Sequence, residues 1–209
     1  MDVLTTPPRY ELKYHLELNS NISNSFFNLL NEKFIKPYED RSIESLYFDD
    51  RHSSFYNDSI EGVAKRVKVR LRGYSNTKES NLEYKFKNND LVWKKIFQSY
   101  NKPLDSVSKN YNINHRYMLH PIFIIRYKRK YFQNKNNSIR VTIDSKLQTK
   151  KFSNSESLRW KKMNSPNINI IEIKCSTEDL ENAKIIEANF NLNRIRNSKY
   201  TDAYDLLNK

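Results

Sequence analysis

The sequence predicts an α+β fold, in which an antiparallel sheet of eight or more strands closes into a β-barrel with a few helices outside it. Eight segments alternate apolar and polar residues, as strands do when successive side chains point to opposite faces of a sheet. Three of these segments place a glutamate two residues before a lysine, so both charges fall on one face. The three pairs are Glu11 and Lys13, Glu83 and Lys85, and Glu172 and Lys174.

The strands are predicted in order from this alternation. They are expected at 9–18, 43–50, 64–74, 81–88, 91–98, 122–133, 138–145 and 168–175. A further short strand is expected near 147–152 or 158–162. Closure into a barrel is favoured because it removes the unpaired edges that an open sheet would expose.

Three helices are predicted between and after the strands. Residues 21–36 carry an apolar stripe that ends before Pro37. The segment 176–190 opens with Ser176, which is typical of an N-terminal cap. A short helix is expected at 200–207. Residues 101–120 have apolar residues at helical spacing, and no chemistry is assigned to them.

The charged faces leave two interpretations open. An antiparallel sheet commonly has one face in water, where lysine, arginine and glutamate are ordinary. Alternatively, the charged face lines the inside of a barrel, and helices cover the apolar face. The second interpretation is favoured by four cations in one strand, which repel each other unless an anion lies among them. They are Arg66, Lys68, Arg70 and Arg72.

Composition limits the function classes. The net charge of +13 on 209 residues predicts a polyanionic partner. Because the cations are interleaved with glutamates, a compact polyanion is favoured and no nucleic acid is expected. Two glycines are too few for a phosphate-binding P-loop or a dinucleotide fingerprint, so side chains must bind any phosphate. No apolar run reaches the roughly 20 residues of a membrane span, which predicts a cytoplasmic protein and leaves a membrane partner open.

The charged residues suggest two kinds of site. The glutamates Glu11, Glu83 and Glu172 could converge and hold Mg²⁺ or Mn²⁺ through carboxylate oxygens, or each could pair with a neighbouring cation. Cations on separate strands could bind phosphate oxygens, arginine in a bidentate manner and lysine as a point charge. This second set is Lys13, Arg70, Arg72, Lys85, Arg129 and Arg140.

Short sequence blocks in a fixed order resemble the VTC domain, the polyphosphate polymerase domain named after the vacuolar transporter chaperone. The blocks are Arg9-Tyr10-Glu11-Leu12-Lys13-Tyr14, Ser45-Leu46-Tyr47-Phe48-Asp49, Lys68-Val69-Arg70-Leu71-Arg72, Glu83-Tyr84-Lys85, Tyr127-Lys128-Arg129, Arg140-Val141-Thr142-Ile143-Asp144, Ile171-Glu172-Ile173-Lys174 and Ser198-Lys199-Tyr200. The resemblance implies one domain over 1–209 with a core at about 9–204. It also implies an eight-stranded triphosphate tunnel that uses ATP and Mn²⁺ or Mg²⁺ to extend polyphosphate.

The resemblance also implies roles for individual residues. Glu172 would be the main metal ligand, with Glu11 and Glu83 in support. Lys94 or its neighbour Lys95 would supply a further cation, and Ser198 would bind phosphate. Arg196, which stands where a lysine is expected, and Arg9 would also bind substrate. Arg9 stands where related triphosphatases and cyclases carry a glutamate, which favours the VTC branch. The phosphate path would be lined by Lys13, Arg70, Arg72, Lys85, Arg129, Arg140 and Lys199.

Three functions are therefore considered. The first is a metal-dependent polymerase that transfers the γ-phosphate of ATP to a growing polyphosphate chain. The second is a hydrolase of triphosphate, polyphosphate or nucleoside triphosphates on the same fold. The third is a non-catalytic module that binds polyphosphate. The oligomeric state is left open.

Overall fold

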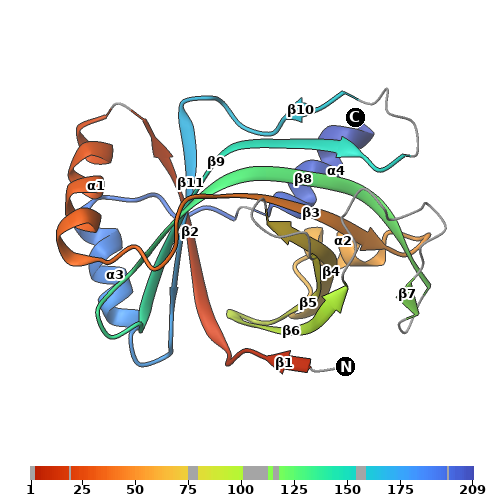
Figure 1. Ribbon diagram of the computed structural model, residues 1–209, viewed down its shortest axis with the longest axis horizontal. Helices are drawn as coiled ribbons and strands as arrows, with labels where there is room; N and C mark the ends of the chain where they lie inside the picture. The colour runs from red at the N-terminus through yellow and green to blue at the C-terminus, as the bar shows by residue number, and fades with distance from the viewer. Residues whose placement is uncertain are drawn as a thin grey trace.

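Eight antiparallel strands form a closed barrel in the computed structural model (Figure 1), which describes residues 3–18, 20–74, 80–100, 113–114, 118–153, 159–196 and 198–209. Each strand pairs with the next, and the last pairs with the first. The order around the barrel is β9 (Ile139–Lys151), β11 (Ile168–Cys175), β2 (Arg9–Glu17), β6 (Leu91–Tyr100), β5 (Ser80–Asn88), β4 (Lys65–Tyr74), β3 (Arg41–Asp49) and β8 (Met118–Gln133). The predicted fold class is confirmed.

Three short strands and four helices complete the described structure. The strands β1 (Val3–Thr5), β7 (Ile113–Asn114) and β10 (Lys161–Lys162) pair with β6, β8 and β9. The helices are α1 (Asn21–Lys33), α2 (Ser54–Ile60), α3 (Leu180–Asn189) and α4 (Lys199–Asn208).

Several element boundaries differ from the prediction. Strand β9 does not stop at residue 145 but continues to Lys151, through a register shift against β8 and a left-handed Lys146 with a φ of 55°. The expected strand near 147–152 is therefore part of β9. Helix α1 ends at Lys33 instead of residue 36, because Ile35 exchanges backbone hydrogen bonds with Gln133. Helix α3 begins at Leu180, four residues later than predicted.

Helix α2 was not predicted, because carboxylates at the end of the preceding strand, and not a residue of the helix itself, satisfy its first turn. The backbone N–H groups of Phe55 and Tyr56 donate to the Asp49 carboxylate at 3.0 and 3.1 Å, so a residue on the preceding strand satisfies the first turn. In the predicted helical stretch 101–120, residues 101–112 and 115–117 lie outside the described part of the chain. Ile113 belongs to strand β7 rather than to a helix.

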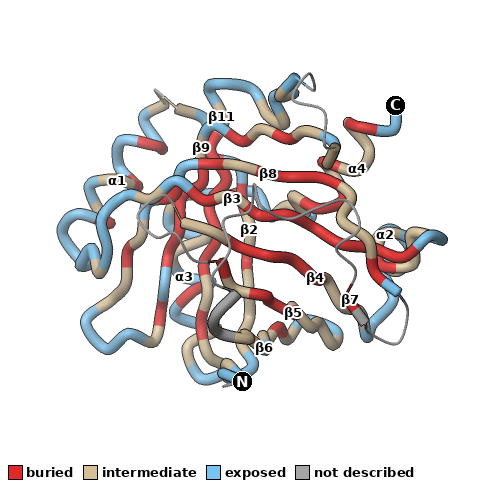
Figure 2. The backbone as a smooth tube through the Cα atoms, turned by 45° about the vertical axis from the view of Figure 1, so that its right-hand side comes forward, coloured by how far each residue is buried: buried red, intermediate tan, exposed pale blue. Residues whose placement is uncertain are grey.

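Two apolar clusters hold the helices against the barrel. Helices α1 and α3 cover the outer face of β2, β9 and β11, where Phe26 and Ala183 pack with Leu12, Tyr14 and Ile173 (Figure 1). Helices α2 and α4 pack against each other and join a second cluster with β3, β4 and β8. Figure 2 shows the buried residues running along these strands, while the outer sides of α1 and α3 are exposed. The apolar faces of the strands therefore serve the cores outside the barrel.

Candidate phosphate-binding tunnel

The charged faces of the strands point into the barrel, as the strand registers show. Lys13 on β2 lies opposite Glu172 on β11, and Glu11 lies opposite Lys174. On the other side of the barrel Arg70 of β4 lies opposite Glu83 of β5. The buried carboxylates Glu83 and Glu172 are only 3% and 6% exposed, which excludes the interpretation of a solvated face.

The barrel contains a cavity of about 1050 Å³ that is partly open to solvent, since exposed residues such as Glu61 and Asp90 are part of its lining. Thirteen of its lining residues are lysine or arginine and four are aspartate or glutamate, a net formal charge of +9. Buried charge of one sign is costly without compensation. The cavity is therefore suited to a polyanion that supplies negative charge. Its cations are Lys13, Arg66, Lys68, Arg70, Arg72, Lys85, Lys87, Lys94, Arg129, Lys174, Arg194, Arg196 and Lys199.

Glu83 organises three of the cations on one wall. Its Oε2 accepts hydrogen bonds from Arg70 Nε at 2.8 Å and Nη2 at 2.5 Å, and from Lys94 Nζ at 3.3 Å. Arg72 Nη1 lies 3.8 Å from the same oxygen. Burial acts to raise the pKa of Glu83, but Arg70, Lys94 and Arg72 hold it well below its usual value. Glu83 is thus an ionised anchor beneath these cations.

Asp144 is the corresponding buried carboxylate on the opposite wall, where it binds two cations. Arg129 binds it in a bidentate manner, with Nε 2.6 Å from Oδ1 and Nη2 2.7 Å from Oδ2. Lys199 Nζ, from the first turn of α4, lies 2.7 Å from Oδ2. Burial opposes ionisation, yet Arg129 and Lys199 bring the pKa of Asp144 to about 2. Asp144 therefore fixes a strand cation and a helix cation at one place.

Glu11 and Glu172 lie between these walls on neighbouring strands. Glu11 Oε2 is 2.5 Å from Lys85 Nζ, and Glu172 Oε2 is 2.9 Å from Lys174 Nζ. Burial raises the pKa of Glu11 and the neighbouring Glu172 adds to that effect, but Lys85 and other lysines bring it below its usual value. Glu11 Oε1 is buried without a hydrogen bond, and Arg9 Nη2 is 3.6 Å away from it.

The two glutamates fit a divalent cation only in part. Within the described residues no three acidic, histidine or cysteine side chains form a metal cluster. However, Glu11 Oε1 is a buried carboxylate oxygen without a donor, which is the hard ligand that Mg²⁺ and Mn²⁺ prefer. Two carboxylates would leave most of the shell to phosphate oxygens and water, the usual arrangement for Mg²⁺ with nucleotides.

Several lysines of the cavity have a lowered pKa, because burial disfavours their charged form. Burial lowers the pKa of Lys13 and Lys174 to about 8, although Glu172 opposes the effect in both. Burial also puts the pKa of Lys68 and Lys94 well below the usual value. A bound anion would reverse this effect, so anion binding and lysine protonation are coupled.

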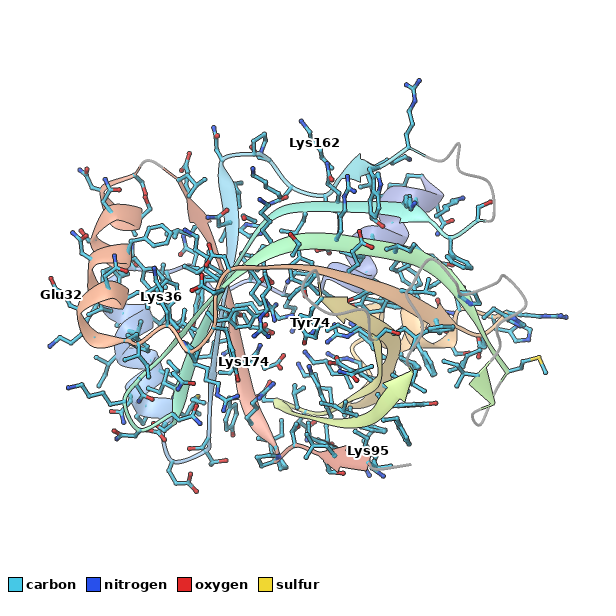
Figure 3. All side chains as sticks on the ribbon, viewed as in Figure 1. Glu32, Lys36, Tyr74, Lys95, Lys162 and Lys174 are labelled. Atoms are coloured by element: carbon cyan, nitrogen blue, oxygen red, sulfur yellow. The ribbon has the colours of Figure 1, made fainter. Side chains whose placement is uncertain are left out.

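Most of the predicted site residues are brought together. Lys94 rather than Lys95 faces the cavity, and Lys95 is exposed. Figure 3 places Lys174 in the middle of the molecule, and Lys95 at its periphery. Glu83 is buried beneath its cations, outside the cavity lining. The predicted residues that line the cavity are Lys13, Arg70, Arg72, Lys85, Lys94, Arg129, Arg196, Ser198, Lys199, Glu11 and Glu172.

Two predicted residues lie apart from the cavity. Arg140 is exposed, and its Nε donates to Asn137 Oδ1 at 2.8 Å instead of facing the cavity. Arg9 is near Glu11 but does not line the cavity. Both side chains are on the inward-facing side of their strands. They lie near the strand ends, where the alternation of faces continues but the cavity does not extend.

Sequence reasoning missed other members of the site. Lys68 lines the cavity and donates to Ser198 Oγ at 2.7 Å, and Lys174 lines it as well. Asp144 had not been selected, although it shares the inward-facing alternation of Thr142. Tyr127 also lines the cavity, and its hydroxyl accepts a hydrogen bond from Arg72 Nη2 at 2.9 Å. The period-two pattern could have identified all of these residues.

The fold and the cavity define the protein class: a closed antiparallel barrel with a charged interior is the triphosphate tunnel fold. Within that class the chain belongs to the VTC domain family, whose model matches residues 6–208. The resemblance of the sequence blocks is therefore confirmed. A comparison with curated protein sequences finds no significant match.

Solved structures share the fold at low identity. A protein named PH1819 from Pyrococcus horikoshii is 12% identical with a TM-score of 0.55, covering 95% of this chain and 99% of its own. A Vibrio parahaemolyticus protein described as a candidate adenylate cyclase is 12% identical with a TM-score of 0.55, covering 93% and 97%. HpAC1 from Hippeastrum, described with a dominant triphosphatase activity, is 11% identical with a TM-score of 0.53, covering 94% and 96%.

None of the helices in the described part of the chain has the length and apolar character needed to span a bilayer.

Proposed function

We propose that this protein is a metal-dependent polyphosphate polymerase that transfers the γ-phosphate of ATP to a growing polyphosphate chain. The observation that carries the proposal is the cavity with a net formal charge of +9 in a chain of the VTC family. Phosphoryl transfer requires mainly positioning of both reactants and stabilisation of spreading negative charge. A rigid array of cations supports both requirements.

The two buried carboxylate anchors explain how the array would be rigid. Glu83 holds Arg70, Arg72 and Lys94 on one wall. Asp144 holds Arg129 and Lys199 on the other wall. We propose that triphosphate oxygens bind between these walls and accept hydrogen bonds from those N–H groups of the arginines and lysines that the carboxylates do not occupy. The anchors fix the cations before substrate arrives, so binding costs little side-chain entropy.

Lys13, Lys85 and Lys174 would bind phosphate between the two walls as mobile point charges. Glu172, with Glu11 beside it, would hold Mn²⁺ or Mg²⁺ together with phosphate oxygens. When bound, the ion would neutralise charge on the transferring phosphoryl group. Ser198 and Arg196 lie at the edge of the cavity, where they would contact the outer phosphates or the nucleotide.

The proposal is tested by incubating the protein with ATP and Mn²⁺ and measuring ADP, orthophosphate and polyphosphate separately. Polymerase activity gives polyphosphate and ADP in step, with little orthophosphate. Glu172→Gln is expected to abolish turnover but to retain tripolyphosphate binding in EDTA. Glu61→Gln, which changes an exposed carboxylate of the cavity lining, is the matched control and should retain activity.

A hydrolase is the second candidate function. It is favoured by the triphosphatase description of the structurally similar Hippeastrum protein. Orthophosphate as the sole phosphate product would support hydrolysis, and tight binding without turnover would support a binding module.

A further inference from the structure

The inward-facing side of the barrel continues beyond the cavity. Tyr74 and Tyr131 stand two residues beyond Arg72 and Arg129 on the same strands and the same face, about 7 Å farther along. Arg41 on β3 lies directly opposite Arg129. Arg72 and Arg129 line the cavity, whereas Arg41 and the two tyrosines do not. Figure 3 labels Tyr74 near the middle of the view, and its side chain is half-buried.

Arg41 is surrounded by aromatic rings in this layer. Its Cζ lies 4.4 Å from the centre of the Tyr38 ring, 5.7 Å from Tyr74 and 5.8 Å from Tyr131. Its Nε is buried without a hydrogen-bond partner, and no ion pair among the described residues includes it. Ring faces attract a guanidinium but accept none of its in-plane N–H bonds. Arg41 therefore has donors and charge left for an anion.

Further polar groups lie near this layer on strand β9. Thr142, opposite Tyr131, has a buried Oγ1 without a hydrogen-bond partner. Arg140, two residues from Thr142 on β9, lies opposite Lys174 and is exposed. Cations thus lie inside the cavity at Lys174 and Arg129, in the aromatic layer at Arg41, and outside at Arg140.

One of the aromatic residues, Tyr38, lies outside the barrel strands. Tyr38 is 50% exposed and lies in the connection between α1 and β3, outside the strands. Tyr131, by contrast, is held in strand β8, with Tyr38 against it at 5.4 Å between ring centres. Moving Tyr38 away from Arg41 would open one side of the layer while the strand pairing stays intact.

We propose that Arg41 and the three tyrosines form a second phosphate-binding site, which takes the part of a linear polyphosphate that extends beyond the cavity. The inference rests on the proposed function, because it needs a substrate longer than a triphosphate. Each phosphate of such a chain carries negative charge, so the part that leaves the cavity needs its own cations. Arg41 supplies a bidentate donor there, and displacement of Tyr38 gives the chain its path.

The test compares a short and a long ligand by calorimetry, in EDTA, without nucleotide and at fixed ionic strength. The ligands are tripolyphosphate and a polyphosphate of several tens of phosphates. Loss of one charge-assisted contact predicts that Arg41→Ala binds the long chain about tenfold more weakly. Its affinity for tripolyphosphate should stay within about twofold of the wild type. Arg41→Lys, which keeps the charge without the planar fork, should lie between the two proteins for the long chain.

Arg126→Ala is the matched control, since the Arg126 guanidinium also lies over an aromatic ring, 3.9 Å from Trp160, but outside the cavity. It should bind both ligands as the wild type does. Equal loss for both ligands in Arg41→Ala, or no loss in either, would overturn the proposal. If Arg41→Ala does not fold, Arg41→Lys decides: an unchanged long-chain affinity overturns the proposal. Because no turnover is measured, failure here is distinguishable from failure to make polyphosphate.

Discussion

Replacement of Glu83 by glutamine tests whether the cation array depends on its buried anchor. The substitution keeps the size of the side chain but leaves Arg70, Arg72 and Lys94 without their counterion. Glu83 is only 3% exposed, so water cannot replace the lost carboxylate charge. Removing one partner of a buried ion pair costs about 3–5 kcal/mol. In a chain of this size each kcal/mol lowers the melting temperature by about 2–4 °C. We therefore expect Glu83→Gln to melt about 6–20 °C below the wild type.

Tripolyphosphate should restore much of this loss. The three cations released by Glu83→Gln belong to the tunnel wall, so a bound anion can replace the missing carboxylate. The assay is thermal unfolding, followed by circular dichroism, with and without saturating tripolyphosphate in EDTA. The ligand should raise the melting temperature of Glu83→Gln more than that of the wild type. Affinity for Mn²⁺, measured separately, should be unchanged.

The control is Glu61→Gln, which removes an exposed carboxylate of the cavity lining and should leave the melting temperature unchanged. A Glu83→Gln protein that melts within about 2 °C of the wild type would refute the assignment of Glu83 as the anchor, given the cost of an unpaired buried charge. A fall in Mn²⁺ affinity without a change in stability would instead make Glu83 a metal ligand, as the sequence suggested.

Four further predictions concern pH, the phosphate path and stability. Because Lys13 and Lys174 have a pKa of about 8, tripolyphosphate binding should weaken as pH rises from 7 to 9.5, and binding at pH 8 should take up protons, both measurable by calorimetry. The same lowered pKa values mean that unfolding takes up protons, so the stability of the unliganded protein should rise between pH 8 and 10.5, as followed by chemical denaturation. Arg140→Ala should bind tripolyphosphate within about twofold of the wild type in calorimetry, since one exposed ion contact contributes little; a tenfold loss would place Arg140 in the triphosphate site. Asp49→Ala should lose about 2–4 kcal/mol of stability in urea, because the first turn of α2 and the Tyr200 hydroxyl lose their acceptor; an unchanged midpoint would contradict this role.

The alternation of residues was sufficient to predict the barrel strands and the charged face that lines the cavity, whereas Lys94, Arg196, Ser198 and Lys199 were expected only from the family resemblance. Period two assigns each side chain to a face from sequence alone, so Lys13, Arg70 and Glu172 could be placed on one surface before any fold was known. The same rule failed for Arg140, because the alternation predicts which face of a strand a side chain is on but not how far along the strand the cavity extends. Helix α2 was missed because its first turn is satisfied by Asp49, a residue outside the helix.

The sequence by itself determined that this protein has a sheet with one charged and one apolar face, a strong positive charge, and the ordered blocks of the VTC family. Only the tertiary structure decided which charges meet. Pairing of each carboxylate with particular cations depends on strand order and register, which join residues as distant in sequence as Glu11 and Lys85. Local periodicity contains no information about these contacts. Closure of the barrel between β8 and β9 turned a charged surface into the lining of a cavity, where burial strengthens the attraction between the same cations and an anion.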